Sequence, residues 1–354
     1  MVGGESNHGH DGVRSTATAG ERSDAMRSDG GRAVFSLRRW AAAVSVALAV
    51  PFGVAAVGVA PPAAAALDPA GIDFWVDSRM GPIKSRVFRA ADGNTDRVVY
   101  ALDGLRARND LSGWEIDTQI SRVLPQWNIN VVMPVGGRSS FYSDWIAPSN
   151  TNGQRTAYAW ETFLTDDLRW ALRERLGFNP YGNGVFGLSM GGSAALTLAA
   201  YHPDQFGYAG SYSGYLNISA PGMREGLRLA LLDAGGFNID AMWGPPWDPR
   251  WLRNDPFMFA PLLRQNGTRL WIATGNGRNG PQDVIEEPID VYHLGNAMAL
   301  ETIALTNTRA FQARIDSIGG ANAVFDYTPV GVHSWHYWEA QVYKMLPDLS
   351  AYLG

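Results

Sequence analysis

The sequence predicts an α/β protein in which a central, mostly parallel sheet carries helices on both faces. Short, continuous apolar runs at 98–102, 130–135 and 269–274 are typical of buried parallel strands. Helical patterns follow these runs after polar loops, as in strand–helix–strand units. A third observation is the stretch 184–201, which has the pattern of a strand, a sharp turn at Ser189 and a helix of small residues.

The turn in this stretch matches the G-x-S-x-G pattern of a nucleophile elbow, from Gly187 to Gly191. Glycines suit the two flanking positions because side chains there would collide with the neighbouring strand and helix. The turn raises the hydroxyl of Ser189 above the sheet, and it places the backbone N–H of Met190 at a helix N-terminus, where an oxyanion would be stabilised. The pattern predicts an α/β-hydrolase fold; a Gly-rich turn with a solvent-exposed serine is the alternative.

Composition narrows the class of protein. The chain has 354 residues, of which 46% are hydrophobic and 18% charged, and this is ordinary for one large globular domain. A net charge of −5 gives no indication of nucleic acid or an anionic membrane surface as a partner. The absence of cysteine excludes disulfides, thiolate metal sites and a cysteine nucleophile.

Residues 1–66 are interpreted as a polar leader and a secretory signal peptide. An arginine pair precedes the apolar run 41–60, and an alanine-rich end suggests cleavage near Ala66. Proline and glycine interrupt the run and make a permanent membrane anchor less favourable. Residues 67–354 are then a single secreted α/β-hydrolase domain, located outside the cell or in the cell envelope.

The order of the remaining elements follows from periodicity. Further strands are expected at 83–90 (an edge strand), 206–213 and 322–327, and further helices at about 118–124, 162–176, 290–318 and 336–349. Residues 217–262 are rich in Pro, Gly and Trp, and they are interpreted as an irregular insertion that caps the site. No internal repeat and no second domain is indicated.

A serine nucleophile needs a histidine base, and the histidine needs an orienting carboxylate. In α/β-hydrolases the order along the chain is serine, acid, histidine. His333 follows the last expected strand and is the best base, whereas His202 ends the nucleophile helix and His336 has a supporting place in the next helix. The acid stays open on pattern alone, with these candidates: Asp283, Glu286, Glu287, Asp290 and Glu301.

A second oxyanion donor is expected from the loop Asp103–Arg106. This loop follows the strand at 98–102 and precedes a helix, so it lies at the carboxyl edge of the sheet, where open α/β sheets bind ligands. In α/β-hydrolases the second oxyanion N–H comes from such a loop. The backbone N–H of Leu105 is the candidate.

Several further motifs carry a family resemblance. They include Leu102–Ala107, Val132–Gly137, Ser139–Trp145, Trp160–Leu164, Gly187–Met190, Ala200–Pro203, Asp233–Gly236, Met242–Pro245, Arg253–Pro256 and His333–Trp335. With these motifs the chain resembles the secreted mycolyltransferases of the antigen 85 group, which are esterase-D-like α/β-hydrolases. The resemblance extends over roughly residues 70 to 353.

The resemblance implies roles for particular residues. Ser189 corresponds to the family's nucleophile and His333 to its base. The family's acid is a glutamate 32 residues before the histidine, which favours Glu301. The oxyanion donors correspond to the backbone N–H groups of Leu105 and Met190. Substrate-binding positions correspond to Asp103, Arg106, Asn217, Ser334 and Trp335.

The activity implied by the resemblance is transfer of a mycolyl group between trehalose monomycolates, or onto arabinogalactan, through an acyl-enzyme. No metal or cofactor is implied, and fibronectin is a possible protein partner. The chain departs from the family at Thr274, where the family has cysteine, and around 283–292, so acyl-chain length and acceptor stay open. A secreted carboxylesterase and a non-catalytic envelope or fibronectin-binding protein are the alternatives.

Overall fold

The computed structural model describes residues 67–354. The expected signal peptide lies in residues 1–66 and therefore outside the described residues. Within 67–354, no helix is both long and apolar enough to cross a membrane.

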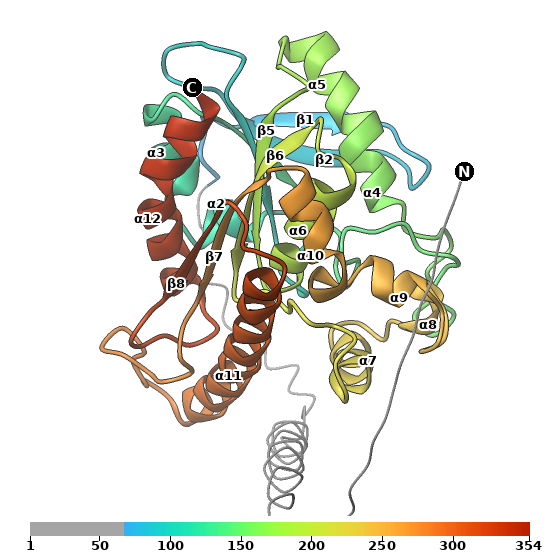
Figure 1. Ribbon diagram of the computed structural model, residues 1–354. Helices are drawn as coiled ribbons and strands as arrows, with labels where there is room; N and C mark the ends of the chain where they lie inside the picture. The colour runs from blue at the N-terminus through green and yellow to red at the C-terminus, as the bar shows by residue number, and fades with distance from the viewer. Residues whose placement is uncertain (1–66) are drawn as a thin grey trace, which may run out of the picture. The chain divides into compact units, whose positions relative to one another are not determined.

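An eight-stranded sheet forms the centre of the fold, in the order β1-β2-β4-β3-β5-β6-β7-β8 (Figure 1). The strands are β1 (Ile72–Val76), β2 (Ile83–Phe88), β3 (Val98–Leu102), β4 (Asn130–Pro134), β5 (Asn183–Leu188), β6 (Phe206–Tyr212), β7 (Arg269–Thr274) and β8 (Ala323–Tyr327). β2 pairs antiparallel with β1 and β4, and all the other pairs are parallel. The prediction of a mostly parallel sheet is confirmed.

The expected edge strand needs a correction. The strand at 83–88 lies between β1 and β4, so β1, which the sequence pattern did not indicate, takes the edge. Only Phe74 and Val76 of β1 are buried, while Trp75 is 53% exposed. A five-residue strand with so little burial carries a weak periodic signal.

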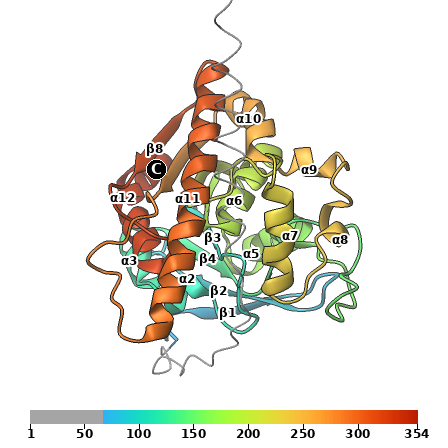
Figure 2. The same ribbon diagram turned by 90° about the horizontal axis from the view of Figure 1, so that it is seen from below.

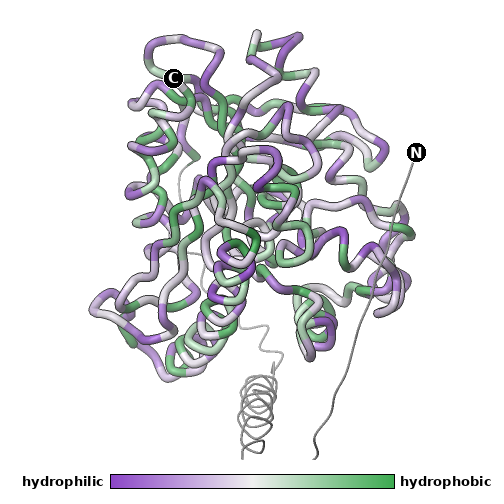
Figure 3. The backbone as a smooth tube through the Cα atoms, viewed as in Figure 1, coloured by the Kyte–Doolittle hydropathy of each residue, from purple (hydrophilic) through white to green (hydrophobic). Residues whose placement is uncertain are grey.

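Helices cover both faces of the sheet, as predicted. They are α2 (Gly113–Ile116), α3 (Ile120–Gln126), α4 (Trp160–Thr162), the π-helical turn η1 (Phe163–Asp167), α5 (Leu168–Leu176), α6 (Met190–Tyr201), α7 (Met223–Asp233), α8 (Asp240–Trp243), α9 (Arg250–Arg253), α10 (Pro256–Gln265), α11 (Pro288–Ser317) and α12 (Trp335–Leu353). Helices α2, α3 and α12 share one apolar cluster with the strands, and α5, α6, α10 and α11 share the other. The apolar segments gather on the central strands and α6 in Figure 3.

The segment 217–262 is more ordered than expected. It contains α7, α8, α9 and most of α10, and the last of these packs against α6 as part of the core. Seen from below, α6 lies in the view between α7 and α11 (Figure 2). The expectation of irregular structure is therefore wrong, because four helices lie in this segment, and its place as a cap over the site stays a prediction.

Candidate active site

The candidate nucleophile lies at a strained turn between β5 and α6. Ser189 has φ 53° and ψ −120°, a backbone conformation that non-glycine residues rarely adopt. Its N–H donates to the carbonyl of Tyr212 on β6, at 2.8 Å, which ties the turn to the neighbouring strand. Ser189 follows the buried strand β5 and precedes the buried helix α6, as the elbow pattern predicted.

Two glycines make this turn possible. A Cβ on Gly187 would lie 2.5 Å from the backbone of Gly191, and a Cβ on Gly191 would lie 2.5 Å from the carbonyl oxygen of Asp103. Atoms cannot approach so closely, so any side chain would push the helix off the strand. The glycines of the motif are therefore required by the packing of α6 on the sheet.

Glu301 and His333 form a buried pair beside the sheet edge. The Nδ1 atom of His333 lies 2.9 Å from Oε2 of Glu301, and their side chains are 8% and 1% exposed. The backbone N–H of His333 donates to the carbonyl of Ala297, so helix α11 holds both residues. Because an ionised carboxylate only accepts hydrogen bonds, Nδ1 of His333 is the donor in this pair, and in a neutral imidazole Nε2 is then the acceptor.

The other oxygen of Glu301 is fully occupied by donors. Its Oε1 accepts from the hydroxyl of Ser213 at 2.7 Å, the hydroxyl of Thr274 at 2.9 Å and the N–H of Gly275 at 2.5 Å. Burial alone would raise the pKa of Glu301, but His333, Ser213 and the N–H of Gly275 outweigh it and hold the pKa below its usual 4.5. The carboxylate is therefore ionised and fixed in direction.

The other acid candidates have different partners. Asp283 lies 3.3 Å from Nε2 of His336 and accepts a 2.7 Å bond from the hydroxyl of Tyr337. Asp290 accepts from backbone N–H groups at the start of α11, and Glu286 and Glu287 are exposed. The structure thus places Glu301 beside His333, whereas the acids that follow β7 more closely in the sequence have other surroundings.

Aromatic rings surround the candidate base, and Tyr215 is one of them. Its ring lies nearly parallel to the imidazole of His333, with centroids 6.2 Å apart and 19° between the planes. Burial raises the pKa of Tyr215 to about 12. His333 also meets the ring of Trp338 edge-on, with centroids 4.9 Å apart. The imidazole of His333 therefore packs against two aromatic rings.

The candidate oxyanion donors lie against the same turn. A Cβ on Gly104 would lie 3.6 Å from Cβ of Ser189, so the loop that carries Leu105 reaches the nucleophile. Within residues 67–354, neither the N–H of Leu105 nor that of Met190 donates a hydrogen bond to the protein. Two unpaired N–H groups near a strained serine fit an oxyanion site.

The predicted sugar-binding residues of this loop differ in exposure. Asp103 is 2% exposed, and its carboxylate accepts from the backbone N–H groups of Gly113 and Trp114. Burial raises the pKa of Asp103 to about 7. Arg106, in contrast, has a side chain that is 66% exposed and pairs with Asp233 at the end of α7. Asp103 thus supports the loop, while Arg106 is available to a ligand.

The other predicted substrate residues lie at the same edge. The N–H of Asn217 donates to the side chain of Asn307 on α11, and its own side chain is partly exposed. Ser334 precedes α12 and lies 3.3 Å from Nδ1 of His336. The ring of Trp335 meets Trp114 edge-on at 5.4 Å, so it packs largely against α2.

Sequence reasoning assigned no catalytic role to Ser213, Thr274 or Tyr215. Ser213 directly follows β6 and Thr274 ends β7, so both lie at the carboxyl edge of the sheet. Their position at this edge could have indicated that both residues belong to the site. The hydroxyl of Ser213 also accepts from the indole N–H of Trp338 at 2.9 Å, so it joins α12 to Glu301.

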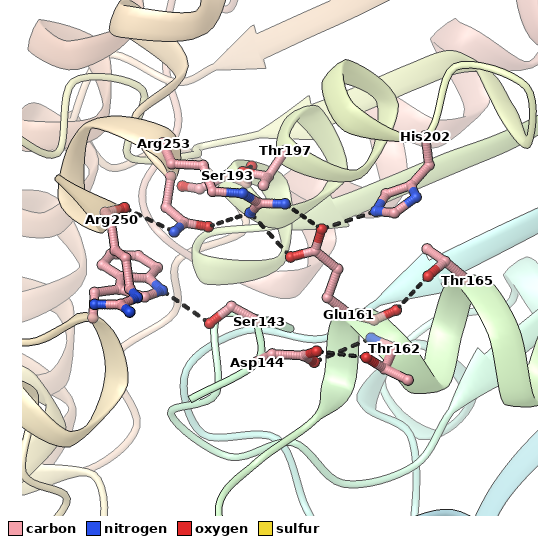
Figure 4. A network of polar contacts seen from close by, with 12 residues as sticks. Ser143, Asp144, Glu161, Thr162, Thr165, Ser193, Thr197, His202, Arg250 and Arg253 are labelled. Carbon is pink, nitrogen blue, oxygen red and sulfur yellow. Dashed lines mark hydrogen bonds and ion pairs between the residues drawn. The ribbon is translucent and has the colours of Figure 1, made fainter. Parts of the chain in front are cut away.

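A second histidine–glutamate pair lies away from the nucleophile, at the C-terminal end of α6 (Figure 4). Glu161 lies between His202, at 2.8 Å, and Arg253, which donates two bonds of 2.5 and 3.0 Å. Through these contacts Glu161 on α4 connects to His202 at the end of α6 and to Arg253 on α9. His202 thus has the structural place at a helix end that its sequence position indicated.

The chain is similar to known proteins over most of its described length. The family described as "Putative esterase" matches residues 82–349. The chain is 44% identical to diacylglycerol acyltransferase/mycolyltransferase Ag85C of Mycobacterium leprae, over 74% of this chain and 76% of that protein. It is 46% identical to the Ag85A enzyme of Mycobacterium ulcerans, over 74% and 75%.

Two solved structures share the fold of this chain. MPT51 (FbpC1) of Mycobacterium tuberculosis is 30% identical with a TM-score of 0.69, over 80% of this chain and 99% of that one. The serine hydrolase FphF of Staphylococcus aureus is 16% identical with a TM-score of 0.56, over 79% and 98%, and it shares the fold.

Proposed function

Because this chain belongs to the Ag85 diacylglycerol acyltransferase/mycolyltransferase family of esterases, we propose that it transfers a long-chain acyl group between trehalose esters. The donor is a trehalose monomycolate and the product is trehalose dimycolate. The reaction is a double displacement with an acyl-enzyme on Ser189. The observation that carries this proposal is the buried Glu301–His333 pair at the same sheet edge as the strained turn of Ser189.

In the first half-reaction the oxygen of Ser189 attacks the ester carbonyl, and its proton passes to Nε2 of His333. The ionised Glu301 holds the imidazole through Nδ1–H and stabilises the imidazolium that forms. The N–H groups of Leu105 and Met190 bind the oxyanion, each contributing about 3 kcal/mol. The intermediate then collapses: the bond to the sugar oxygen breaks, and that oxygen takes the proton from His333.

In the second half-reaction a hydroxyl of another sugar attacks the acyl-enzyme. His333 removes the proton of that hydroxyl, the second tetrahedral intermediate uses the same N–H groups, and Ser189 is released with the proton from His333. In this proposal Arg106 donates hydrogen bonds to sugar oxygens, and the exposure of its guanidinium supports that role. Asn217, Ser334 and Trp335 are further candidates for the substrate contact, and Asp103 acts by holding the loop.

The same resemblance supports finer proposals about place and partners. The apolar run behind a basic flank in 41–60 supports export to the cell envelope. Cell-wall arabinogalactan is proposed as a second acceptor and fibronectin as a protein partner.

The test is a product assay. The protein without residues 1–66 is incubated with a trehalose monoester, beside Ser189→Ala, and diester, free trehalose and free fatty acid are quantified. Diester and free trehalose in equal amounts, both dependent on Ser189, are the expected result. Free acid without diester would make the protein a carboxylesterase, and no product from a folded protein with a long-chain donor would contradict the proposal and favour a binding role.

A further inference from the structure

The loop 136–142, shortly after β4, has an unusual backbone. Ser139, Phe141 and Tyr142 have φ angles of 59°, 51° and 46°, in the left-handed region that residues with a side chain rarely adopt. All three residues are buried. Such a conformation costs free energy, persists only where the surrounding structure enforces it, and is found mainly at functional sites. The loop is therefore held in place by its contacts with the rest of the molecule.

Two of these contacts fasten the segment that carries the candidate oxyanion donor Leu105. The hydroxyl of Tyr142 accepts the backbone N–H of Asp103 at 3.0 Å. The N–H of Ser139 donates to the carbonyl of Leu105, also at 3.0 Å. The peptide unit that carries the N–H of Leu105 lies between these two bonds. Because peptide units are planar, anchors on both sides limit the directions in which that N–H can point.

A third contact reaches the other candidate donor. The N–H of Phe141 donates to the sulfur of Met190 at 3.1 Å, and Met190 is fully buried. Met190 begins α6, and its own backbone N–H is the second group proposed to bind the oxyanion. The loop 136–142 is thus hydrogen-bonded to the segment or the residue that carries each of the two donors.

The aromatic side chains of the loop are fixed as well. The ring of Tyr142 meets Trp160 edge-on, with centroids 5.5 Å apart, and the ring of Phe141 meets Trp243 with centroids 5.2 Å apart. Trp160 begins α4 and Trp243 ends α8. The loop is therefore anchored to two helices, and it gives the candidate oxyanion donors a rigid support.

We propose that Tyr142 is a positioning residue of the acyl transfer: its hydroxyl holds the backbone of Asp103 so that the N–H of Leu105 points at the oxyanion. The sulfur of Met190 ties the second donor to the same loop. The inference rests on the proposed function, because it needs an oxyanion to form on the ester that Ser189 attacks. It assigns the effect to the transition state and leaves substrate affinity unchanged, since the oxyanion forms only after attack.

The experiment uses the full chain and measures kcat and KM for a short p-nitrophenyl ester, together with Ki for an alkyl trifluoromethyl ketone. Such a ketone forms a tetrahedral adduct with a serine nucleophile, and its oxygen resembles the oxyanion, so its affinity reports on the donors. Tyr142→Phe keeps the ring and removes the acceptor hydroxyl. Met190→Leu keeps the backbone N–H and removes the sulfur at similar volume.

The matched control is Tyr208→Phe. It removes another buried tyrosine hydroxyl, which donates to Asp348 on α12 at 2.8 Å and has no contact with the loop 136–142 among the hydrogen bonds of residues 67–354. This control shows what the loss of one buried hydroxyl does to the enzyme by itself.

We expect Tyr142→Phe to lower kcat about tenfold and to raise Ki by the same factor, with KM within about twofold. Removal of a whole oxyanion donor costs about 10²- to 10³-fold in kcat, and a misdirected donor keeps part of that contribution. Met190→Leu should change kcat and Ki together by about threefold, because sulfur is a weak acceptor. Tyr208→Phe should leave both within about twofold of the wild type.

Three outcomes would overturn the inference, and they are distinguishable. A lower kcat with an unchanged Ki in Tyr142→Phe would indicate a loss of folded protein, because the remaining sites would bind the ketone as before. Unchanged kcat and Ki would show that the hydroxyl does not position the donor, while the proposed function stands. If the wild type hydrolyses the ester no faster than Ser189→Ala, the proposed function fails and the inference fails with it.

Discussion

Two glutamate–histidine pairs in this molecule have almost the same separation and opposite surroundings. Glu301 lies 2.9 Å from His333, and Glu161 lies 2.8 Å from His202. Distance therefore does not distinguish a candidate catalytic pair from a structural one. What differs is the imidazole nitrogen that each glutamate holds and the other partners of each carboxylate.

At the sheet edge, Glu301 holds Nδ1 of His333 and otherwise binds only neutral donors. Its negative charge is thus available to an imidazolium, and in the proposed mechanism Nε2 accepts the proton of Ser189. In the network of Figure 4, Glu161 holds Nε2 of His202 and its charge is already balanced by Arg253. The first arrangement suits proton transfer, and the second suits a fixed connection between helices.

The largest expected effect follows from exchanging each carboxylate for an amide. Glu301→Gln should lower kcat about 10³- to 10⁴-fold, because the imidazole loses its orienting acceptor and the charge that stabilises its protonated form. Glu161→Gln should leave kcat within about threefold. Both are measured with the p-nitrophenyl ester at saturating substrate, and equal losses in the two variants would contradict the distinction.

Stability should show the reverse order. Glu161→Gln leaves the guanidinium of Arg253 without a charged partner and should cost on the order of 2 kcal/mol of unfolding free energy. Glu301→Gln keeps an acceptor oxygen for Ser213, Thr274 and Gly275, so its cost should be smaller. Urea unfolding of the two variants and the wild type measures this, and a larger loss in Glu301→Gln would be inconsistent with it.

Removal of a single hydroxyl at the Glu301–His333 pair tests how much the neutral donors contribute to kcat. Thr274→Val removes one of the three bonds to Oε1 of Glu301 and should lower kcat about fivefold without changing KM. The matched control is Thr268→Val, because the buried hydroxyl of Thr268 has no partner within the described residues. Similar kcat values for Thr274→Val and the wild type would show that the other two donors suffice.

The smallest expected effect is a change with pH in the difference in unfolding free energy between the wild type and Glu161→Gln. Burial raises the pKa of Glu161, but His202 and Arg253 more than compensate and lower it below 4.5. A carboxylate with a lowered folded pKa adds stability above its unfolded pKa, and this is lost as pH falls through the folded value. The gap in unfolding free energy between the two proteins should therefore be constant above pH 5 and shrink below pH 4.5. A gap that widens in acid would contradict the lowered pKa.

The nucleophile turn and the parallel strands could be predicted from the sequence because their signals are local. Apolar runs mark β3, β4 and β7, and the glycines around Ser189 are required by packing that any such elbow shares. The segment 217–262 could not be predicted in this way. Helices α8 and α9 have four residues each and depend on distant contacts, such as the bonds of Arg228 to Asp240.

The candidate acid shows a different limit. Asp283 is nearer in sequence to β7, yet it faces His336, while α11 places Glu301 beside Gly275. The choice depends on where a 30-residue helix begins and how it packs, and periodicity does not fix either. The family resemblance favoured Glu301 because the family's glutamate lies 32 residues before its histidine, as Glu301 does before His333.

The most direct test of the proposed acyl transfer is intact-protein mass spectrometry after mixing with a trehalose monoester and rapid acid quenching. The account predicts a protein heavier by one acyl group, with the added mass on the peptide that contains Ser189, and no adduct in Ser189→Ala. Addition of free trehalose should remove the adduct and return monoester. An adduct on another residue would contradict a serine acyl-enzyme. So would turnover of the monoester with no adduct in the wild type and none in His333→Ala.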